Sequence, residues 1–234
     1  MLHHQIFIGP DRQKYQHHYL CHYIPKSAGS DDLSRSLISF KRGIPLHVDT
    51  WVECTAEELR KSLYGWIYLI LRILSSEELF AKSRGISPMN HLGRTIGSTL
   101  KSIYLPELLH KKRSVKKLKF LNSNERFTEL EGVYTFTRPP AGFSFNRILI
   151  IDDILTTGAT MCSAISAIRE EMPDIPIQLF TLATTQYQGA SNPNLKIPPI
   201  PYLWKSEGLN KVAESGISYL IPSLLKQKIL KDSW

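Results

Sequence analysis

Two adjacent carboxylates and a threonine-rich stretch form the segment of the chain best suited to chemistry. Asp152 and Asp153 follow the apolar run Ile148–Ile151, and Thr156–Thr160 comes just before a segment with helical periodicity. Backbone N–H groups and hydroxyls at the start of a helix converge on an anion, so the second stretch predicts a phosphate site. Carboxylates do not favour a nearby phosphate, so the acidic pair needs hydroxyl donors or a metal ion as its partner. A ribose 5-phosphate offers both groups.

The residues around this segment predict the elements that position it. The run Ile148–Ile151 is continuous and apolar, which is typical of a central strand covered on both faces, and we expect it to stop at the acidic pair. Apolar residues then recur at helical spacing over 161–172, up to Pro173, and 175–183 predicts another strand. The unit is therefore strand, loop, helix, strand.

Two well-known nucleotide-binding motifs are absent from the sequence. The chain contains neither the G-x-x-x-x-G-K-[ST] motif of P-loop nucleotide hydrolases nor the G-x-G-x-x-G motif of dinucleotide-binding folds. The remaining alternative for the acidic pair and the threonine-rich loop is a solvated turn followed by a helix cap, which would carry no chemistry.

Upstream, local signals predict a series of further elements. Ser87-Pro88 predicts a helix start, and the box Thr55–Glu58 predicts a short helix that ends near Tyr64. The polar stretch Asn122–Glu125 is expected as a loop. Strands are expected at Tyr19–Ile24, Pro45–Val52, Trp66–Leu74, Val115–Phe120 and Gly132–Phe136.

Composition limits the class of protein. The chain has 234 residues, of which 42% are hydrophobic and 21% are charged, as in an ordinary globular domain. The longest apolar run ends at Arg72, far short of the roughly 20 residues that a membrane helix needs. The start Met1–His4 lacks the features of an export signal, so we expect a cytoplasmic protein. The three cysteines are widely spaced and form no C-x-x-C pair.

The net charge of +8 is concentrated in one region. Between Lys101 and Arg126 the sequence holds eight basic residues and two acidic ones. This segment has two interpretations: a mobile loop that closes over pyrophosphate, or a solvated face. Such a charge also permits nucleic-acid binding, which we do not favour. The histidines near Cys21 are expected at the surface or an interface rather than in a metal site.

The segment ILIIDDILTTGAT, Ile148 to Thr160, resembles the signature of type I phosphoribosyltransferases, which bind 5-phosphoribosyl 1-pyrophosphate (PRPP). The resemblance implies that Asp152 and Asp153 contact the ribose 2- and 3-hydroxyls. It implies that the loop of Thr156, Thr157, Gly158, Ala159 and Thr160 wraps the 5-phosphate. Mg²⁺ is the implied cofactor and accompanies the pyrophosphate, near Asp152 and Asp153.

Within this family the chain is similar to the ComF-like branch, which is associated with DNA uptake and utilisation. The segment Lys119–Phe136 resembles that branch's arginine-bearing flexible loop and the strand that follows it, with Lys119 and Arg126 as the loop's basic residues. Arg84-Gly85 also fits the branch. The four-cysteine zinc ribbon that commonly begins ComF-like proteins is absent from this sequence.

The resemblance also implies a fold, an assembly and a second loop. The expected fold is α/β, with a mainly parallel sheet, helices on both faces and a small hood. Homodimers are implied. By position in the family, a pyrophosphate loop follows the first core strand, and its residues here are Arg72, Ser75 and Ser76. We expect an N-terminal extension over 1–54, a core over 55–185, and a hood segment with a C-terminal helix over 186–234.

The expected function is transfer of a phosphoribosyl group from PRPP to an unknown nitrogenous acceptor, with release of pyrophosphate, in nucleotide or nucleobase metabolism. The alternative is a PRPP-sensing regulator or a ComF-like accessory protein of DNA utilisation that does not turn PRPP over.

Overall fold

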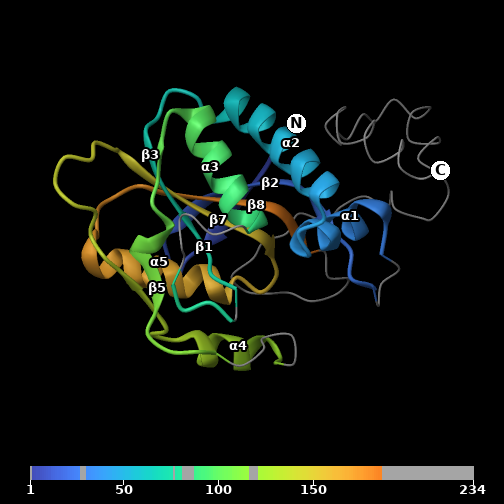
Figure 1. Ribbon diagram of the computed structural model, residues 1–234. Coiled ribbons are helices and arrows are strands. Elements are labelled where there is room, and N and C mark those ends of the chain that lie inside the picture. Colours follow the sequence, from blue (N-terminus) through green and yellow to red (C-terminus); the bar gives the residue numbers. More distant parts are fainter. Residues whose placement is uncertain (1, 27–29, 76, 81–86, 116–120, 186–234) are drawn as a thin grey trace.

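The computed structural model describes residues 2–26, 30–75, 77–80, 87–115 and 121–185, which form an α/β fold (Figure 1). Its main sheet has six strands in the order β1-β2-β8-β7-β3-β4. These strands are β1 (His3–Ile8), β2 (Lys14–Tyr23), β3 (Tyr68–Arg72), β4 (Ile103–Tyr104), β7 (Arg147–Leu155) and β8 (Ile177–Thr185). Every neighbouring pair is parallel except β1 and β2. The expected α/β class with a mainly parallel sheet is confirmed.

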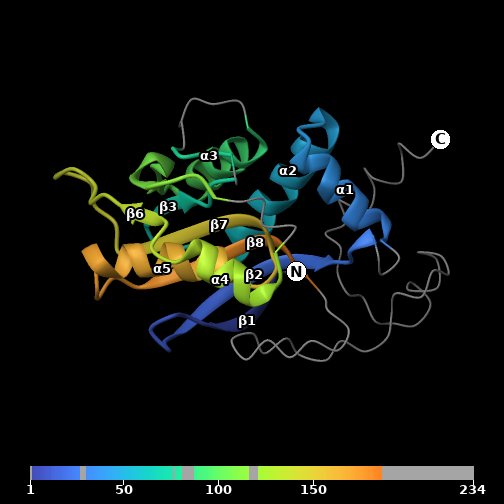
Figure 2. The same cartoon turned by 90° about the horizontal axis from the view of Figure 1, so that it is seen from below.

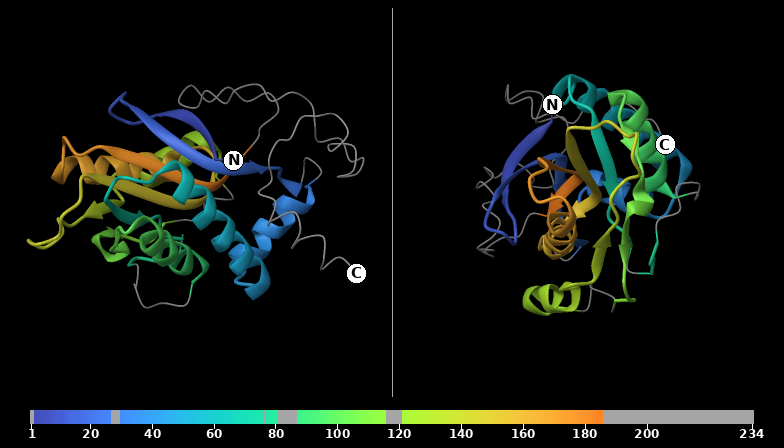
Figure 3. Two further views of the ribbon diagram at one scale, coloured as in Figure 1. Left: turned by 90° about the horizontal axis from the view of Figure 1, so that it is seen from above. Right: turned by 90° about the vertical axis from the view of Figure 1, so that its left-hand side faces the viewer.

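Helices cover both faces of the main sheet. They are α1 (Asp32–Lys41), α2 (Pro45–Ser62), α3 (Pro88–Leu100), α4 (Ser123–Leu130) and α5 (Ala159–Glu171). Figures 1 and 3 show α1, α2 and α3 grouped on one side of the sheet and α5 on the other, with α4 beyond α5. A short 3-10 turn, η2 (Pro106–Leu108), leads into a small antiparallel sheet of β5 (Leu109–Lys111) and β6 (Tyr134–Phe136).

The central strand β7 explains how one apolar run supports two cores. Ile148 and Ile150 face the core that contains α5, whereas Leu149 and Ile151 face the core beneath α1, α2 and α3. Side chains alternate between the faces of a strand, so a strand covered on both sides needs an unbroken apolar run. The predicted central strand is confirmed, although it does not stop at the acidic pair but continues to Leu155.

The N-terminal segment belongs to the main sheet. β2 pairs in parallel with β8, from Gln16 opposite Gln178 to Tyr23 opposite Thr185, and β1 adds an edge strand to it (Figure 2). The 1–54 segment, expected as an extension, therefore supplies two of the six strands. His17 is fully buried within the chain and its ring bonds Gln5 and Thr181, so the surface or interface position expected for it is wrong.

Two local predictions upstream of β3 are wrong. Residues 45–52, expected as a strand, form the first turns of α2, in which Pro45 occupies the helix start. Thr55 lies inside this helix, and its hydroxyl donates to the Trp51 carbonyl at 2.7 Å instead of capping a new one. Val48, Trp51, Val52 and Leu59 are all buried along one helical stripe, so packing selects the helix for these β-favouring residues.

Elements predicted downstream of α2 are confirmed in most cases. Ser87 caps α3 by accepting from the Asn90 N–H, as predicted. The strands expected at Trp66–Leu74 and Gly132–Phe136 are present as β3 and β6. The expected loop Asn122–Glu125 instead forms the capped start of α4, because Asn122 and Glu125 bond each other's backbone N–H groups reciprocally.

Some predictions lie outside the described residues. They include most of the strand expected at Val115–Phe120, the Arg84-Gly85 pair and the 186–234 segment. Among the residues that are described, no helix combines the length and apolar character that a membrane crossing needs.

Candidate functional site

The acidic pair lies in β7 itself, near the carboxyl edge of the main sheet. Asp152 is opposite Thr181 of β8, so the pair sits where the parallel strands β7 and β8 approach their carboxyl ends. The Asp152 Oδ1 accepts from the Asp153 N–H at 2.8 Å, and the Asp153 Oδ1 accepts from the Ile154 N–H at 2.6 Å. These bonds fix both carboxyl groups at the edge where α/β sheets bind ligands.

A lysine from the N-terminal region contacts the acidic pair. Lys41, the last residue of α1, places its Nζ 2.9 Å from the Asp153 Oδ2. Burial alone lowers the pKa of Lys41, but the carboxylates of Asp153 and Asp152 raise it overall. Lys41 therefore stays charged and forms an ion pair with Asp153.

The Asp152 carboxyl group does not titrate like that of an ordinary aspartate. Burial and the neighbouring Asp153 carboxylate raise the pKa of Asp152 well above its ordinary range, against the opposing effect of Lys41. Two adjacent carboxyl groups share one proton more readily than they both ionise. The pair thus combines Asp153, which contacts Lys41, with a carboxyl group, Asp152, that retains its proton more strongly than an ordinary aspartate.

The loop after β7 leads directly into the N-terminus of α5. Gly158 is the N-cap of this helix, with φ of 81° and ψ of −3°, and no side chain caps it. The Ala159 N–H donates to the Thr157 Oγ1 at 3.4 Å. Helix-start N–H groups lack intrahelical partners, and the helix dipole adds positive potential there, so this turn suits an anion.

Glycine is required at position 158 for two reasons. Its positive φ is strained for other residues, and a Cβ there would lie 2.6 Å from Cε2 of Phe7. Phe7 comes from β1 and is fully buried. β1 therefore packs against this loop through Phe7. No local sequence pattern predicted this contact.

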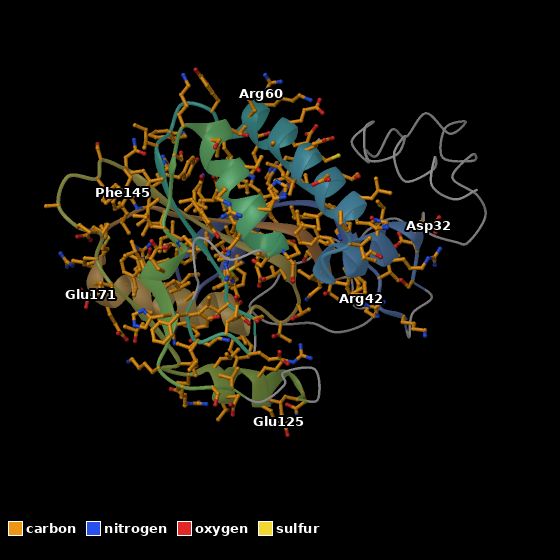
Figure 4. The ribbon with its side chains drawn as sticks, viewed as in Figure 1. Asp32, Arg42, Arg60, Glu125, Phe145 and Glu171 are labelled. Atoms are coloured by element: carbon orange, nitrogen blue, oxygen red, sulfur yellow. The ribbon has the colours of Figure 1, made fainter. Side chains whose placement is uncertain are left out.

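Arg126 lies beside this loop rather than over the region after β3. It belongs to α4, its Nε donates to the Leu121 carbonyl at 3.0 Å, and its Nη1 is 3.4 Å from the Thr156 Oγ1. The helix is attached to α5, because the Ser163 hydroxyl donates to the Leu130 carbonyl at 2.5 Å. In Figure 4, Arg42 marks the end of α1 and Glu125 marks the start of α4, the two elements that contribute Lys41 and Arg126.

The loop after β3 contains the predicted pyrophosphate residues, but its charges are paired internally. Arg72 is 2% exposed and donates from Nη2 and Nη1 to the Glu78 carboxylate at 2.6 and 2.9 Å. Its Nε donates to Asn90 at 2.7 Å. The Ser75 N–H donates to the same Glu78 carboxylate at 2.9 Å. Arg72 therefore holds the loop together instead of pointing into open space.

A second lysine near the acidic pair was not singled out by the sequence. Lys111, in β5, is buried, and its Nζ donates to the Ser75 carbonyl at 2.6 Å. Two predicted residues, Ser76 and Lys119, lie outside the described part of the chain. The structure thus brings together the acidic pair, the Thr156–Thr160 loop, Arg126 and Ser75, and it adds Lys41 and Lys111.

No protein-family model matches this chain, and no curated protein matches it either. A function therefore has to be inferred from the geometry of the site and the residues in it.

Proposed function

We propose that this protein binds PRPP and transfers its phosphoribosyl group to a nitrogenous acceptor, releasing pyrophosphate. The observation that carries the proposal is the end of β7, where an acidic pair is followed within a few residues by an uncapped helix start. Hydroxyl-binding carboxyls and a phosphate-binding turn in this order match the two ends of a ribose 5-phosphate.

The 5-phosphate is expected at the start of α5. There it would accept from the first-turn N–H groups and from the hydroxyls of Thr156, Thr157 and Thr160. The guanidinium of Arg126, 3.4 Å from the Thr156 Oγ1, adds a positive charge at the same end. Charge-assisted hydrogen bonds of this kind are stronger than neutral ones.

The ribose is expected over the acidic pair. Its two hydroxyls would donate to Asp152 and Asp153, and the acidic pair would also offer negative charge to the sugar. Departure of pyrophosphate builds positive charge on the ribose, so a nearby carboxylate stabilises the transition state more than the ground state. Asp153 accepts from Lys41 at 2.9 Å, so a bound ribose hydroxyl must share or replace this contact.

The donor set fits Mg²⁺ carried by the ligand. Carboxylate oxygens are suitable Mg²⁺ ligands, and Asp152 and Asp153 provide them. Within the described ranges, no three His, Cys, Asp or Glu side chains gather closely enough to hold a metal ion. We therefore infer that the ligand's phosphate oxygens supply most of the coordination. When bound, the ion neutralises charge on the departing pyrophosphate.

Calorimetric titration with PRPP and Mg²⁺, followed by a panel of bases and amines, tests this proposal. We expect the wild type to bind PRPP and one acceptor to cause pyrophosphate release. Binding without release would identify a PRPP-sensing protein, and absence of binding would contradict the proposal.

The double variant Asp152→Asn, Asp153→Asn tests the site itself. Loss of the two carboxyl groups should lower PRPP affinity by at least about 100-fold, since both hydrogen-bond acceptors for the ribose hydroxyls and their negative charge are removed. Asp174→Asn, an exposed position after α5, is the matched control and should bind as the wild type does. Unchanged PRPP affinity in a folded double variant would refute the assignment of the acidic pair.

A further inference from the structure

Lys111 is a buried cation next to the loop that follows β3. It is the last residue of β5, where it is opposite Tyr134 of β6, and its side chain is 3% exposed. Its N–H donates to the Leu79 carbonyl at 2.8 Å, which attaches the small sheet to the chain just after this loop. A charged residue almost never lies so deep unless it has partners or a function.

The ammonium of Lys111 faces the backbone of the loop. Its Nζ donates to the Ser75 carbonyl at 2.6 Å and lies 5.7 Å from the centre of the Tyr134 ring. The Tyr134 hydroxyl is 3.3 Å from both the nitrogen and the oxygen of Leu74. Tyr134 and Lys111 of the β5–β6 sheet thus hold the backbone of Leu74 and Ser75 in place. The charged end of Lys111 contacts this backbone at the Ser75 carbonyl.

Four titratable groups act on Lys111, and they leave an excess of positive charge. Glu78 and Asp152 favour its charged form, Arg72 opposes it, and Tyr134 contacts it through its ring. Arg72 already engages Glu78 through two hydrogen bonds. Asp152 retains its proton more strongly than an ordinary aspartate, because burial raises its pKa. Of these groups, Glu78 is therefore the firmly ionised carboxylate that acts on both buried cations, Lys111 and Arg72.

Burial changes the pKa of this lysine. It lowers the pKa of Lys111 to about 8, even though Glu78 and Asp152 act in the opposite direction. A buried cation with incomplete compensation is destabilising, and an anionic ligand at the same place offsets that cost. The incompletely compensated charge of Lys111 thus favours the binding of a strongly charged anion.

The position of Lys111 determines which end of the ligand it meets. β3 is the neighbour of β7, with Arg72 opposite Ile151, so the loop after β3 lies one strand away from the acidic pair. Adjacent strands are about 4.8 Å apart, a spacing that a phosphorylated sugar spans easily. The proposed function places the 5-phosphate at the start of α5, so the pyrophosphate lies towards Ser75.

We propose that the Lys111 ammonium binds the pyrophosphate end of PRPP. The inference rests on the proposed function and extends it to a residue that sequence patterns did not single out. In the free protein the Lys111 ammonium holds the Ser75 carbonyl, and in the complex it also donates to a phosphate oxygen.

Two half-ligands separate this role from a purely structural one. Mg²⁺-pyrophosphate probes the Ser75 side of the site, and ribose 5-phosphate probes the β7 side. Lys111→Met should weaken pyrophosphate binding by about 10- to 100-fold, the loss expected when one charged hydrogen bond is removed. It should change ribose 5-phosphate affinity by less than about twofold, and the adjacent exposed variant Lys112→Met should change neither.

The pH dependence supplies a second measurement, which does not require Lys111→Met to fold. Lys111→Arg keeps its charge at all accessible pH values, whereas wild-type Lys111, with its pKa of about 8, loses its proton as the pH rises through that value. Raising the pH from about 7 to about 9 should therefore weaken wild-type pyrophosphate binding relative to Lys111→Arg. Comparing the two proteins at each pH cancels the titration of pyrophosphate itself.

The results distinguish failure of this inference from failure of the proposed function. A wild type that binds neither probe contradicts both. A wild type that binds both probes, while Lys111→Met binds pyrophosphate equally well or loses both probes equally, overturns only the inference. A wild-type to Lys111→Arg affinity ratio that is constant with pH overturns the role of protonation.

Discussion

The loops after β7 and after β3 occupy equivalent positions on neighbouring parallel strands, yet they are built in opposite ways. The loop after β7 ends in a helix start that no side chain caps, with Gly158 at its N-cap. In the loop after β3, the Glu78 carboxylate accepts from the Ser75 N–H and from Arg72. One loop leads into helix-start N–H groups that no N-cap side chain accepts from, and the other already contains an internal anion.

This difference shows that position at the carboxyl edge of a sheet does not by itself make an anion site. Helix-start donors without intrahelical partners make the β7 loop suitable for phosphate, and backbone geometry keeps them in place. The β3 loop derives its shape from an ion pair, and Lys111 contacts its backbone at Ser75. A substitution that adds bulk should therefore disrupt the β7 loop, and a substitution that removes a charge should disrupt the β3 loop.

Gly158→Ala should have the largest effect on ligand binding. The new Cβ meets Phe7 at 2.6 Å in a backbone conformation with positive φ, so the turn must rearrange. Strain and overpacking together should cost about 2 to 4 kcal/mol. We expect ribose 5-phosphate affinity to fall more than about 100-fold by calorimetry.

Gly132→Ala is the matched control for that variant. Gly132 also has positive φ, at 61°, but a Cβ there meets nothing within 4 Å. This variant should lose about 1 kcal/mol of stability and keep ribose 5-phosphate binding. Equal loss of binding in both variants would show that general destabilisation, rather than the Phe7 contact, governs the loop.

Glu78→Gln should affect stability more than ribose 5-phosphate binding. It leaves the buried Arg72 without its carboxylate, although Asn90 still accepts from the guanidinium. Since Glu78 is 32% exposed, we expect a loss of about 2 kcal/mol in the free energy of unfolding, measured with denaturant.

The exposed Glu170 on α5 provides the control, because Glu170→Gln should change stability by less than about 0.5 kcal/mol. Ribose 5-phosphate affinity should stay within about twofold in Glu78→Gln, since the β7 loop does not depend on Glu78. A larger change would mean that the two loops act as one unit.

Arg126→Met should have the smallest effect of the three when the main effect of each variant is expressed as a free energy. Its Nη1 lies 3.4 Å from Thr156, so its charge should strengthen phosphate binding at the β7 loop by about tenfold. The measurement is ribose 5-phosphate affinity, with pyrophosphate affinity as the internal comparison. A selective loss of pyrophosphate binding would instead support the loop-closing role that the sequence indicated for Arg126.

Sequence patterns were most informative where contacts are local. The β7 strand, the loop 156–160 and α5 follow one another within about 25 residues, and their periodicity and turn chemistry are encoded in that stretch. Predictions failed where a segment depended on distant partners. Residues 45–52 favour a strand locally, but their burial against the sheet selects a helix.

The sequence by itself determined the central strand, the position of the acidic pair after its apolar run, and the helix that follows the loop 156–160. Only the tertiary structure decided that Phe7 supports Gly158, that Lys41 pairs with Asp153, and that Lys111 contacts Ser75. These contacts join residues from 36 to more than 100 positions apart. Neither periodicity nor spacing reports on such pairs, since only the packing of the folded sheet brings them together.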